Sequence, residues 1–467
     1  MEKTTHIAVI PGIGFSHLVP ILQFSKRLIE LHPDFHVTCI VPSLGSLPSA
    51  SKSILQTLPP NINPILLPPV NLSDLPQGVP LLVQIPLIMS HSMPSIHEAL
   101  KSLTTETTLV AMVIDSFAFE ALDFAQEFNI LSYIYFPAAA TTLSALLHLP
   151  KLDEETSCEY RDLPHPIKVP GCVPFHGSDF YGPAQDRTSL VYKYALQRVK
   201  GIRFVDGIFV NSFLEMETSP LRALKDEEKG YPPLYPVGPI VQTATGFSAV
   251  GLECLTWLDK QQVGSVLYVS FGSGGTLSQE QITELAYGLE LSNHKFLWVV
   301  RAPNNTTADA AYLGAQNDVN PLQFLPCGFL ERTKEQGMVI PSWAPQVQVL
   351  GHSSVGGFLT HCGWNSILES ALKGVPFITW PLFAEQKMNA VLLSESLKVG
   401  VRPRVNENGL AEREEIAHVV KLLMEGKEGR EMRIRMKELE EAAANALKED
   451  GSSTNALSHV AFKWNHS

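Results

Sequence analysis

WAPQVQVLGHSSVGGFLTHCGWNSILESALKGVPFITWPLFAEQ, residues 343–386, is the stretch that decides the fold. It contains two short β-rich runs, GGFLT (356–360) and FITW (377–380), and polar residues follow each run closely. A helical stretch that opens at 363–366 and stops near Gly374 lies between them. Strand, loop and helix in this order are typical of a parallel α/β sheet, where ligands bind beyond the carboxyl ends of the strands.

The same alternation continues toward the N-terminus and forms two series. The β-rich runs are IAVI (7–10), HVTCIV (36–41), VAMVI (110–114), YIYF (133–136) and IFVN (208–211) in the first series, and VLYVSF (266–271), FLWVV (296–300) and MVIP (338–341) in the second. Between them, YPPLYPVGPI (231–240) is dense in proline, so we expect a stiff linker that is a poor strand interior. The pattern predicts an α/β protein of two Rossmann-like, doubly wound parallel-sheet domains with a boundary near residue 240.

The stretch 343–386 closely resembles the signature box of plant family 1 UDP-glycosyltransferases in its tryptophans, its HCGWNS core and its terminal Glu-Gln. Nearly the whole chain shares this resemblance, and 148–174 is similar to the branch that glucosylates hydroquinone and phenylpropanoids. The resemblance implies the GT-B fold, with two domains that face each other across a cleft. Residues 1–240 would bind the acceptor and 241–449 the UDP-sugar, with a C-terminal helix (450–467) that packs back on the first domain.

The nucleotide is expected at the start of this box. Trp343 follows a predicted strand and precedes Ala344, so its indole can stack on uracil while the Ala344 backbone binds the edge of the ring. The alternative is an ordinary core tryptophan. The resemblance also implies donor-site roles for Gln346 and for Trp364, and the tryptophan at the latter position goes with glucose.

A diphosphate site is expected where the next helix opens. His361 ends the run 356–360, and free backbone N–H groups and the helix dipole at Gly363 face the space beyond the strand. Asn365, Ser366 and His361 add side-chain donors in place of a metal ion. The chain contains no Asp-x-Asp motif, in agreement with the metal-independent transfer that the resemblance implies. In the turn SFGSGG (270–275), Ser273 either binds a phosphate oxygen or the glycines only permit close packing.

Three further polar residues are expected to bind sugar hydroxyl groups. Glu369 lies four residues after Asn365, on the same helical face, where it either accepts the ribose hydroxyls or is a plain exposed glutamate. Glu385 and Gln386 follow the run 377–380 and can hydrogen-bond a hexose. In the resembling family a final Gln goes with glucose, so we expect UDP-glucose as the donor substrate and no separate cofactor.

The candidate catalytic pair lies in the first series. In PGIGFSHLVP (11–20), two glycines allow a tight turn and His17 comes at the start of a helix, beyond the first strand. Asp115 ends the run VAMVI and projects from the same sheet edge. A carboxylate that binds one imidazole nitrogen fixes the tautomer, so the other nitrogen can act as a general base. A lone histidine after a glycine turn is more often structural, but the resembling family uses the corresponding pair in catalysis.

The expected function is inverting transfer of glucose to the hydroxyl of a small phenol, giving a β-O-glucoside. Apolar residues of the first domain are candidate acceptor walls, although each is equally compatible with a plain core: Ile85, Ile88, Phe117, Phe119 and Ala138. An N- or C-linked product and a catalytically silent UDP-sugar sensor are the alternatives. An NAD-dependent oxidoreductase is disfavoured, because PGIGFSH lacks the third glycine of the dinucleotide fingerprint.

Composition excludes other classes of protein. The 467 residues are 45% hydrophobic and 18% charged, which suffices for sizeable cores, and a net charge of −12 opposes binding to nucleic acid. The six cysteines form no C-x-x-C pair, which favours a reducing compartment. The N-terminus lacks the apolar run of a signal peptide, and no window is apolar enough to span a membrane. We therefore expect a cytoplasmic monomer without stable membrane insertion.

Overall fold

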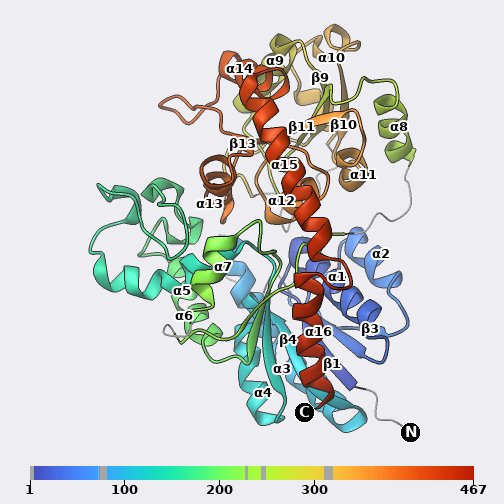
Figure 1. Cartoon of the computed structure of the whole chain (residues 1–467), viewed down its shortest axis with the longest axis vertical. Coiled ribbons are helices and arrows are strands. Elements are labelled where there is room, and N and C mark those ends of the chain that lie inside the picture. The colour runs from blue at the N-terminus through green and yellow to red at the C-terminus, as the bar shows by residue number, and fades with distance from the viewer. Residues whose placement is uncertain are drawn as a thin grey trace. The chain divides into compact units, whose positions relative to one another are not determined.

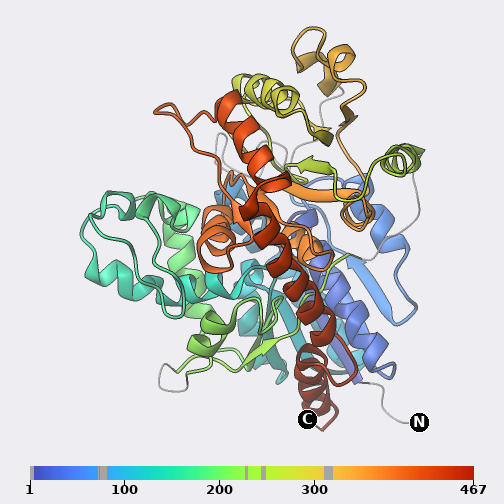
Figure 2. The ribbon, with the colours of Figure 1, turned by 45° about the horizontal axis from the view of Figure 1, so that its top comes forward.

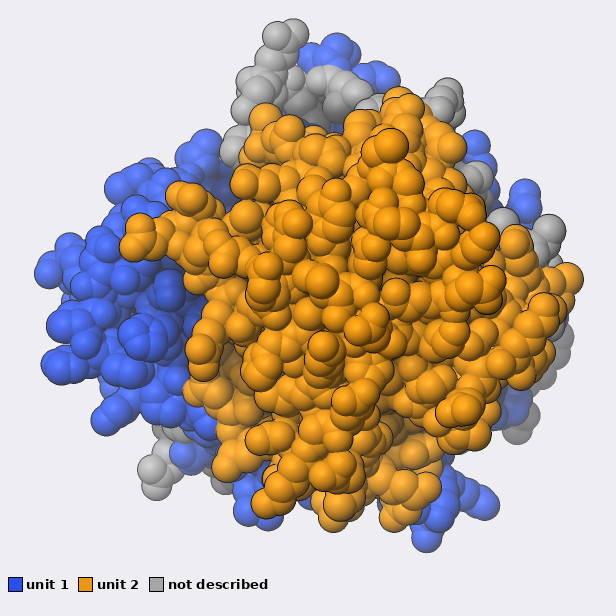
Figure 3. All heavy atoms as spheres, turned by 90° about the horizontal axis from the view of Figure 1, so that it is seen from above, with its two compact units in different colours: residues 1–241, 445–467 blue, residues 242–444 orange. Residues whose placement is uncertain are grey.

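The computed structural model describes residues 5–71, 73, 81–226, 230–242, 249–309 and 319–466. The chain forms two compact units (Figure 3): unit 1 contains residues 1–241 and 445–467, and unit 2 contains residues 242–444. The division after Val241 lies beside the boundary expected near residue 240. The return to unit 1 at Asn445 comes a few residues before the helix expected at 450–467.

Unit 1 is built on a parallel sheet with the strand order β3-β2-β1-β4-β5-β6-β7. Sequence order reverses on either side of β1, as in a doubly wound sheet. The strands are β1 (Thr5–Ile10), β2 (His36–Val41), β3 (Ile62–Leu66), β4 (Thr108–Asp115), β5 (Leu131–Phe136), β6 (Gly207–Val210) and β7 (Leu234–Pro236). The five β-rich runs of the first series lie in strands of this sheet, except that β6 ends one residue before Asn211.

Helices connect these strands and cover the sheet. They are α1 (Phe15–Leu31), α2 (Ser49–Gln56), α3 (Leu81–Glu106), α4 (Leu122–Glu127), α5 (Ala140–Glu155), α6 (Leu190–Ile202), α7 (Thr218–Leu224) and α16 (Ser452–Asn465), with the 3₁₀ helix η2 (Ser116–Ala121) directly after β4. Among the described residues, none of the helices combines the length and the apolar character that a membrane crossing requires.

The strand β7 corrects one expectation, because it lies inside the proline-rich segment 231–240 that was predicted to be a linker. It pairs in parallel with β6, and the side chains of Leu234 and Tyr235 are buried. β7 is the last strand of the sheet, and an edge strand tolerates proline because one side of its backbone has no strand partner. After it, Ile240 exchanges two backbone hydrogen bonds with the Asn211 side chain, at 2.7 and 2.8 Å.

The C-terminal helix α16 belongs to the core of unit 1. Figures 1 and 2 both show α16 beside α1, although the two helices come from opposite ends of the sequence. Its Trp464 is buried, and the indole packs against the rings of Phe35, Tyr133 and Phe209, with centroids 5.2–6.1 Å apart. The Ser453 hydroxyl of the same helix donates to the carbonyl of Gly238 at 2.5 Å. The last residues of the chain therefore complete a core that the first 241 begin.

Unit 2 contains a second parallel sheet, with the order β10-β9-β8-β11-β12-β13. Its strands are β8 (Val266–Ser270), β9 (Lys295–Val300), β10 (Gly337–Pro341), β11 (Val355–Thr360), β12 (Phe377–Thr379) and β13 (Gly400–Val401). The helices are α8 (Ala249–Leu258), α9 (Gln279–Ser292), α10 (Phe329–Arg332), α11 (Gln346–Leu350), α12 (Trp364–Ala371), α13 (Gln386–Val391), α14 (Arg413–Met424) and α15 (Lys427–Ala446), the last of which leads back to unit 1. A core of residues such as Trp298 and Phe329 lies between this sheet and the α9–α14 pair.

Replacing Trp464 by alanine should destabilise unit 1. Removal of a buried aromatic side chain costs about 3–5 kcal/mol of unfolding free energy, because a cavity remains among the neighbouring rings. Urea denaturation of the full chain measures this loss. Phe462→Ala is the matched control, since Phe462 lies on the same helix with 64% of its surface exposed. Equal losses for the two variants would contradict the role of Trp464 in the core.

Candidate active site

The ends of β1 and β4 bring the predicted catalytic pair together in unit 1. Ile10 pairs with Ile114, so the turn after β1 and the residue Asp115 leave the sheet at the same level. His17 lies in the first turn of α1, and its Nδ1 is 2.8 Å from Asp115 Oδ2. Gly12 makes this approach possible, because a Cβ atom there would lie 3.0 Å from Asp115 Oδ1. The second oxygen of Asp115 accepts from Phe117 N at 2.9 Å, which fixes the carboxylate.

Phe117 lies against the predicted catalytic pair and links it to a buried cation. Its ring meets the His17 imidazole edge-on, with centroids 5.1 Å apart. The Arg198 guanidinium of α6 lies 4.7 Å from the Phe117 centroid and donates to the Tyr181 hydroxyl at 2.8 Å. A desolvated cation over an aromatic face is attracted by about 2 kcal/mol. Phe117, a predicted acceptor wall, is therefore held in one orientation beside His17.

The turn that contains Ala138 is fixed by a buried carboxylate. Ala138 precedes α5, and the backbone N–H groups of Ala140 and Thr141 donate to Glu217 at 2.8 and 2.7 Å. The Ser212 hydroxyl donates to the same carboxyl group at 2.6 Å. Burial raises the pKa of Glu217, and these hydrogen bonds partly oppose that rise. Glu217 thus caps the N-terminus of α5 from a distant part of the sequence.

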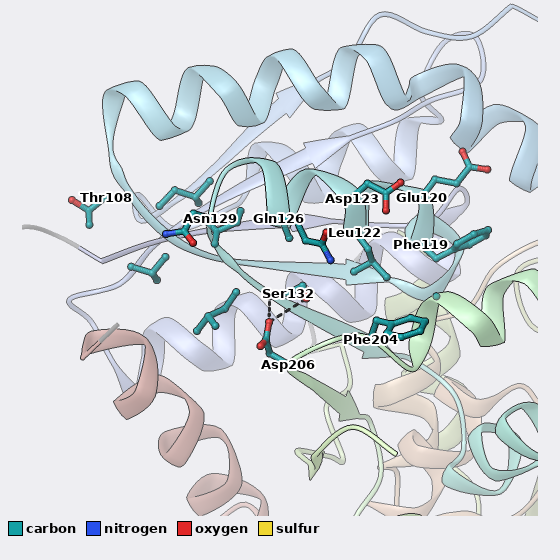
Figure 4. Close-up of a pocket in the computed structure, with 16 residues that line it drawn as sticks. Thr108, Phe119, Glu120, Leu122, Asp123, Gln126, Asn129, Ser132, Phe204 and Asp206 are labelled. Atoms are coloured by element: carbon teal, nitrogen blue, oxygen red, sulfur yellow. Dashed lines mark hydrogen bonds between the residues drawn. The ribbon is translucent and has the colours of Figure 1, made fainter. Parts of the chain in front are cut away.

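The other predicted acceptor residues lie in different surroundings. Ile85 and Ile88 are buried on α3, which packs on η2. Phe119 lines a cavity of about 910 Å³ together with Phe204 and Asp206 (Figure 4). This cavity runs along the first residues of β4 and β5, and neither member of the predicted catalytic pair is among the described residues that line it. The structure therefore places Phe117 beside His17 but directs Phe119 into a separate cavity.

In unit 2, the glycine turn 270–275 and two loops of the signature box leave three neighbouring strands at one level. Thr360 pairs with Ser270 on one side and with Thr379 on the other, so the chain after β8, β11 and β12 emerges at the same edge. Three of the non-glycine residues with positive φ lie in the loops at this edge: Ser342 (68°), Cys362 (64°) and Ala384 (56°). Such backbone is costly and is found most often at functional sites.

His361 lies between two glycines at this edge. A Cβ atom on Gly272 would lie 2.4 Å from His361 Cε1, and one on Gly363 would lie 2.4 Å from Nε2. Burial, and then the positive charge of Arg301, lower the pKa of His361 to about 4. The imidazole is therefore neutral near pH 7 and can contribute a hydrogen bond but no charge.

The two predicted donor-site tryptophans differ in exposure. Trp343 exposes 53% of its surface, which leaves its indole accessible as a stacking platform, whereas Trp364 is 3% exposed at the first turn of α12. Ala344 is buried. The exposure of Trp343 disagrees with the alternative of an ordinary core tryptophan at that position.

Gln346 joins two other predicted donor-site residues. Its Nε2 donates to Ser366 Oγ at 2.9 Å and to Glu369 Oε2 at 2.7 Å, and its Oε1 accepts from Tyr268 at 3.3 Å. Burial raises the pKa of the Glu369 carboxyl to about 7, partly opposed by the Gln346 hydrogen bond. Asn365 and Ser366 lie in the first turn of the same helix, so phosphate and ribose contacts would share α12.

The last two residues of the box lie at the start of α13. Gln386 is buried, and its Oε1 accepts from the backbone N–H groups of Leu382 and Phe383 at 2.9 and 3.0 Å. The amide oxygen thus fixes the loop after β12, and the amide nitrogen remains the group with which Gln386 would contact a sugar. Glu385 precedes it as the N-cap residue of this short helix.

Two residues at this edge were not predicted from the sequence. Asn389 is buried on α13 and donates to the carbonyl of Cys362 at 3.0 Å, which holds the positive-φ residue between His361 and α12. Arg301 follows β9 and donates to the carbonyl of Ser273 at 2.7 Å. A single amide or arginine among many carries no motif, so the sequence offered no signal for either.

The chain is similar to known proteins along nearly its whole length. Residues 229–441 match the family model of UDP-glucoronosyl and UDP-glucosyl transferase. The chain is 52% identical to a hydroquinone glucosyltransferase of Rauvolfia serpentina, over 99% of this chain and 98% of that protein.

Two solved structures are similar throughout. UGT2 of Phytolacca americana, complexed with UDP-2fluoro-glucose and pterostilbene, has a TM-score of 0.91 and 47% identity and covers 98% of this chain and 99% of its own. A UDP-glucosyltransferase from Polygonum tinctorium, capable of glucosylating indoxyl and complexed with 3,4-dichloroaniline, has a TM-score of 0.92 and 46% identity, with 99% of each chain covered. The protein is therefore a glycosyltransferase of the GT-B fold and belongs to the plant family 1 UDP-glycosyltransferases.

Proposed function

We propose that this protein is an inverting, metal-independent glucosyltransferase that transfers glucose from UDP-glucose to the hydroxyl of a small phenol, giving a β-O-glucoside. The observation that carries the proposal is the hydrogen bond of 2.8 Å between His17 Nδ1 and Asp115 Oδ2. It leaves Nε2 of His17 as the nitrogen that can take a proton. His17 then acts as the base, and Asp115 stabilises the imidazolium.

The reaction assigned to these groups is a single displacement. The acceptor hydroxyl loses its proton to His17 while its oxygen attacks the anomeric carbon. The bond from that carbon to the UDP oxygen breaks on the opposite face, so an α-linked donor gives a β-linked product. Backbone N–H groups at the start of α12, with Asn365 and Ser366, would stabilise the charge that develops on the diphosphate.

Other residues of the box bind the rest of the donor in this proposal. The exposed indole of Trp343 stacks on uracil, Ala344 binds the edge of the ring, and Glu369 accepts hydrogen bonds from the ribose hydroxyls. Glu385 and the amide of Gln386 bind glucose. Support comes from the Gln346 hydrogen bonds, which join Ser366 and Glu369 on one helix, and from the relative from Phytolacca americana, which was solved with a fluorinated UDP-glucose.

A small aromatic acceptor is favoured by the wall beside His17. Phe117 offers a fixed ring there, and the relatives carry the names or ligands hydroquinone, pterostilbene and indoxyl, which all contain aromatic rings. An N-linked product is the second candidate, because the relative from Polygonum tinctorium was solved with an aromatic amine. A silent UDP-sugar sensor is disfavoured, since it would not need the His17–Asp115 pair.

His17→Ala should abolish transfer and leave donor binding intact. Loss of a general base lowers kcat/KM by about 10²- to 10⁴-fold. We would measure UDP release from UDP-glucose with a panel of phenols and anilines, with chelator present, and UDP affinity by calorimetry. His97→Ala is the control, because His97 is a surface histidine of the same unit that pairs with Glu127. Equal turnover by wild type and His17→Ala would refute the base, and loss of activity with chelator would refute metal independence.

Affinity for uridine should depend on pH through Glu369. The free carboxyl has a pKa of about 7, and ribose hydroxyls donate best to the ionised form, so protonation competes with binding. Affinity should be constant above this pKa and fall by roughly tenfold per pH unit below it. Calorimetry between pH 5.5 and 8.5 tests this, with Glu369→Gln as the variant whose weaker binding should be independent of pH. A flat wild-type profile would count against the ribose contact.

Gly272→Ala should lower UDP affinity, because the new methyl group would meet the His361 ring and displace the turn that contains Ser273. Loss of a hydrogen bond to a charged phosphate corresponds to about tenfold or more in affinity. Gly264→Ala is the matched control: its φ of 66° resembles the 70° of Gly272, but nothing lies within 4 Å of the added atom. Similar UDP affinities for the two variants would exclude a phosphate role for the turn.

A further inference from the structure

Arg301 bridges two loops of the donor unit from the strand between them. It follows β9, which lies between β10 and β8 in the sheet. Its Nη1 donates to the carbonyl of Ser273, in the turn after β8, at 2.7 Å, and its Nη2 lies 3.4 Å from the carbonyl of Ser342, in the loop after β10. The guanidinium is thus located between the turn proposed to bind phosphate and the loop that presents Trp343.

The positive charge of Arg301 acts at the proposed diphosphate site. Ser273 adjoins Gly272, and the backbone of Gly272 packs directly on the His361 ring. The charge of Arg301 also contributes, after burial, to the low pKa of His361. These two observations place Arg301, the glycine turn and His361 in one cluster at the carboxyl edge of the sheet.

The cluster has a cation but no anion in the described part of unit 2. The hydrogen-bond partners of Arg301 there are backbone carbonyls, and no carboxylate forms an ion pair with it. The carboxylate of Glu369 accepts a hydrogen bond from Gln346 and not from Arg301. Burial lowers the pKa of Arg301, which is the sign of a charge that the protein solvates incompletely. An anionic ligand would stabilise this guanidinium, and neutral His361 offers no competing charge.

We propose that Arg301 is a donor-binding residue whose guanidinium supplies the positive charge at which the diphosphate of the nucleotide sugar binds. This inference rests on the proposed function and adds to it a residue outside the stretch 343–386. A planar guanidinium suits the position, because two of its nitrogens bond the neighbouring loops while the group remains charged. Helix dipole and side-chain donors at α12 then act together with a full positive charge.

A purely structural role predicts a different pattern of binding. If Arg301 only joined the two loops, its loss would move Trp343 and weaken every ligand that contains uracil. If its charge binds phosphate, the loss should grow with the number of phosphates on the ligand. Uridine, UMP and UDP share the base and ribose, so this series separates the two roles without any catalytic turnover.

The test is calorimetry of the full chain with these three ligands. For Arg301→Met we expect UDP affinity to fall by about 10- to 100-fold, the range for a hydrogen bond between charged groups, with a smaller loss for UMP and less than about threefold for uridine. Arg301→Lys keeps the charge and should retain UDP affinity within about tenfold of wild type. Arg332→Met is the control, since Arg332 forms a surface ion pair with Glu290, and should change none of the three.

Equal losses for uridine, UMP and UDP in Arg301→Met would overturn the proposal and leave a structural clamp. Unchanged UDP affinity would overturn it as well. If Arg301→Met does not fold, the Arg301→Lys variant is the test. It keeps the positive charge, so a loss of UDP affinity beyond about tenfold, with uridine affinity unchanged, would contradict a role of the charge alone. Failure of the wild-type chain to bind UDP would refute the proposed function itself, which is a separate result.

Discussion

The parallel direction of the strands is the constraint on which both sites depend. In a parallel sheet every strand ends at the same edge, so side chains that follow different strands meet there although they are far apart in sequence. His17 and Asp115 are separated by 98 residues and meet because β1 pairs with β4 in register. In unit 2, the pairing of Thr360 with Ser270 and Thr379 brings three loops together in the same way.

Hydrogen bonds then give these loops fixed positions. Asp115 uses one oxygen for His17 and the other for a backbone N–H group, Gln346 spans Ser366 and Glu369, and the Gln386 amide oxygen holds the loop after β12. Each of these polar groups is partly or fully buried. A buried polar group that lacks a hydrogen-bond partner costs folding free energy, because it has also lost its hydrogen bonds to water. The same bonds that stabilise the loops therefore also preorganise the two predicted sites, which the proposed reaction requires for stabilising charge in its transition state.

Much of this arrangement could be predicted from the sequence, because strands buried on both faces are apolar runs and the signature box is contiguous. The strands that were missed are atypical. β3 (INPIL) contains a proline and exposed positions, β13 has two residues, and β7 lies among prolines at a sheet edge. Length, composition and periodicity carry the signal for a strand, and each of these three lacks at least one of them.

The residues that escaped prediction in the sites act through contacts that only the tertiary structure creates. Arg301 contacts Ser273 and Ser342 because β9 lies between β8 and β10 in the sheet. The residues around Arg301 in the sequence do not indicate this strand order. Glu217 caps α5 from 77 residues away, and Arg198 of α6 packs on the ring of Phe117 in η2. Phe117 and Phe119 are alike in sequence, yet a 3₁₀ turn directs them to different surroundings, which periodicity cannot resolve.

The return of the chain to unit 1 has a consequence for how the protein is put together. Because residues 445–467 belong to unit 1, unit 2 is an insertion within unit 1 rather than a domain that follows it. During synthesis, all of unit 2 is made before Trp464, so the indole can pack on Phe35, Tyr133 and Phe209 only after residues 242–444 have been added. A chain that stops early lacks this indole, so a protein without its last helix would retain the residues of both predicted sites while the core of unit 1 stayed incomplete.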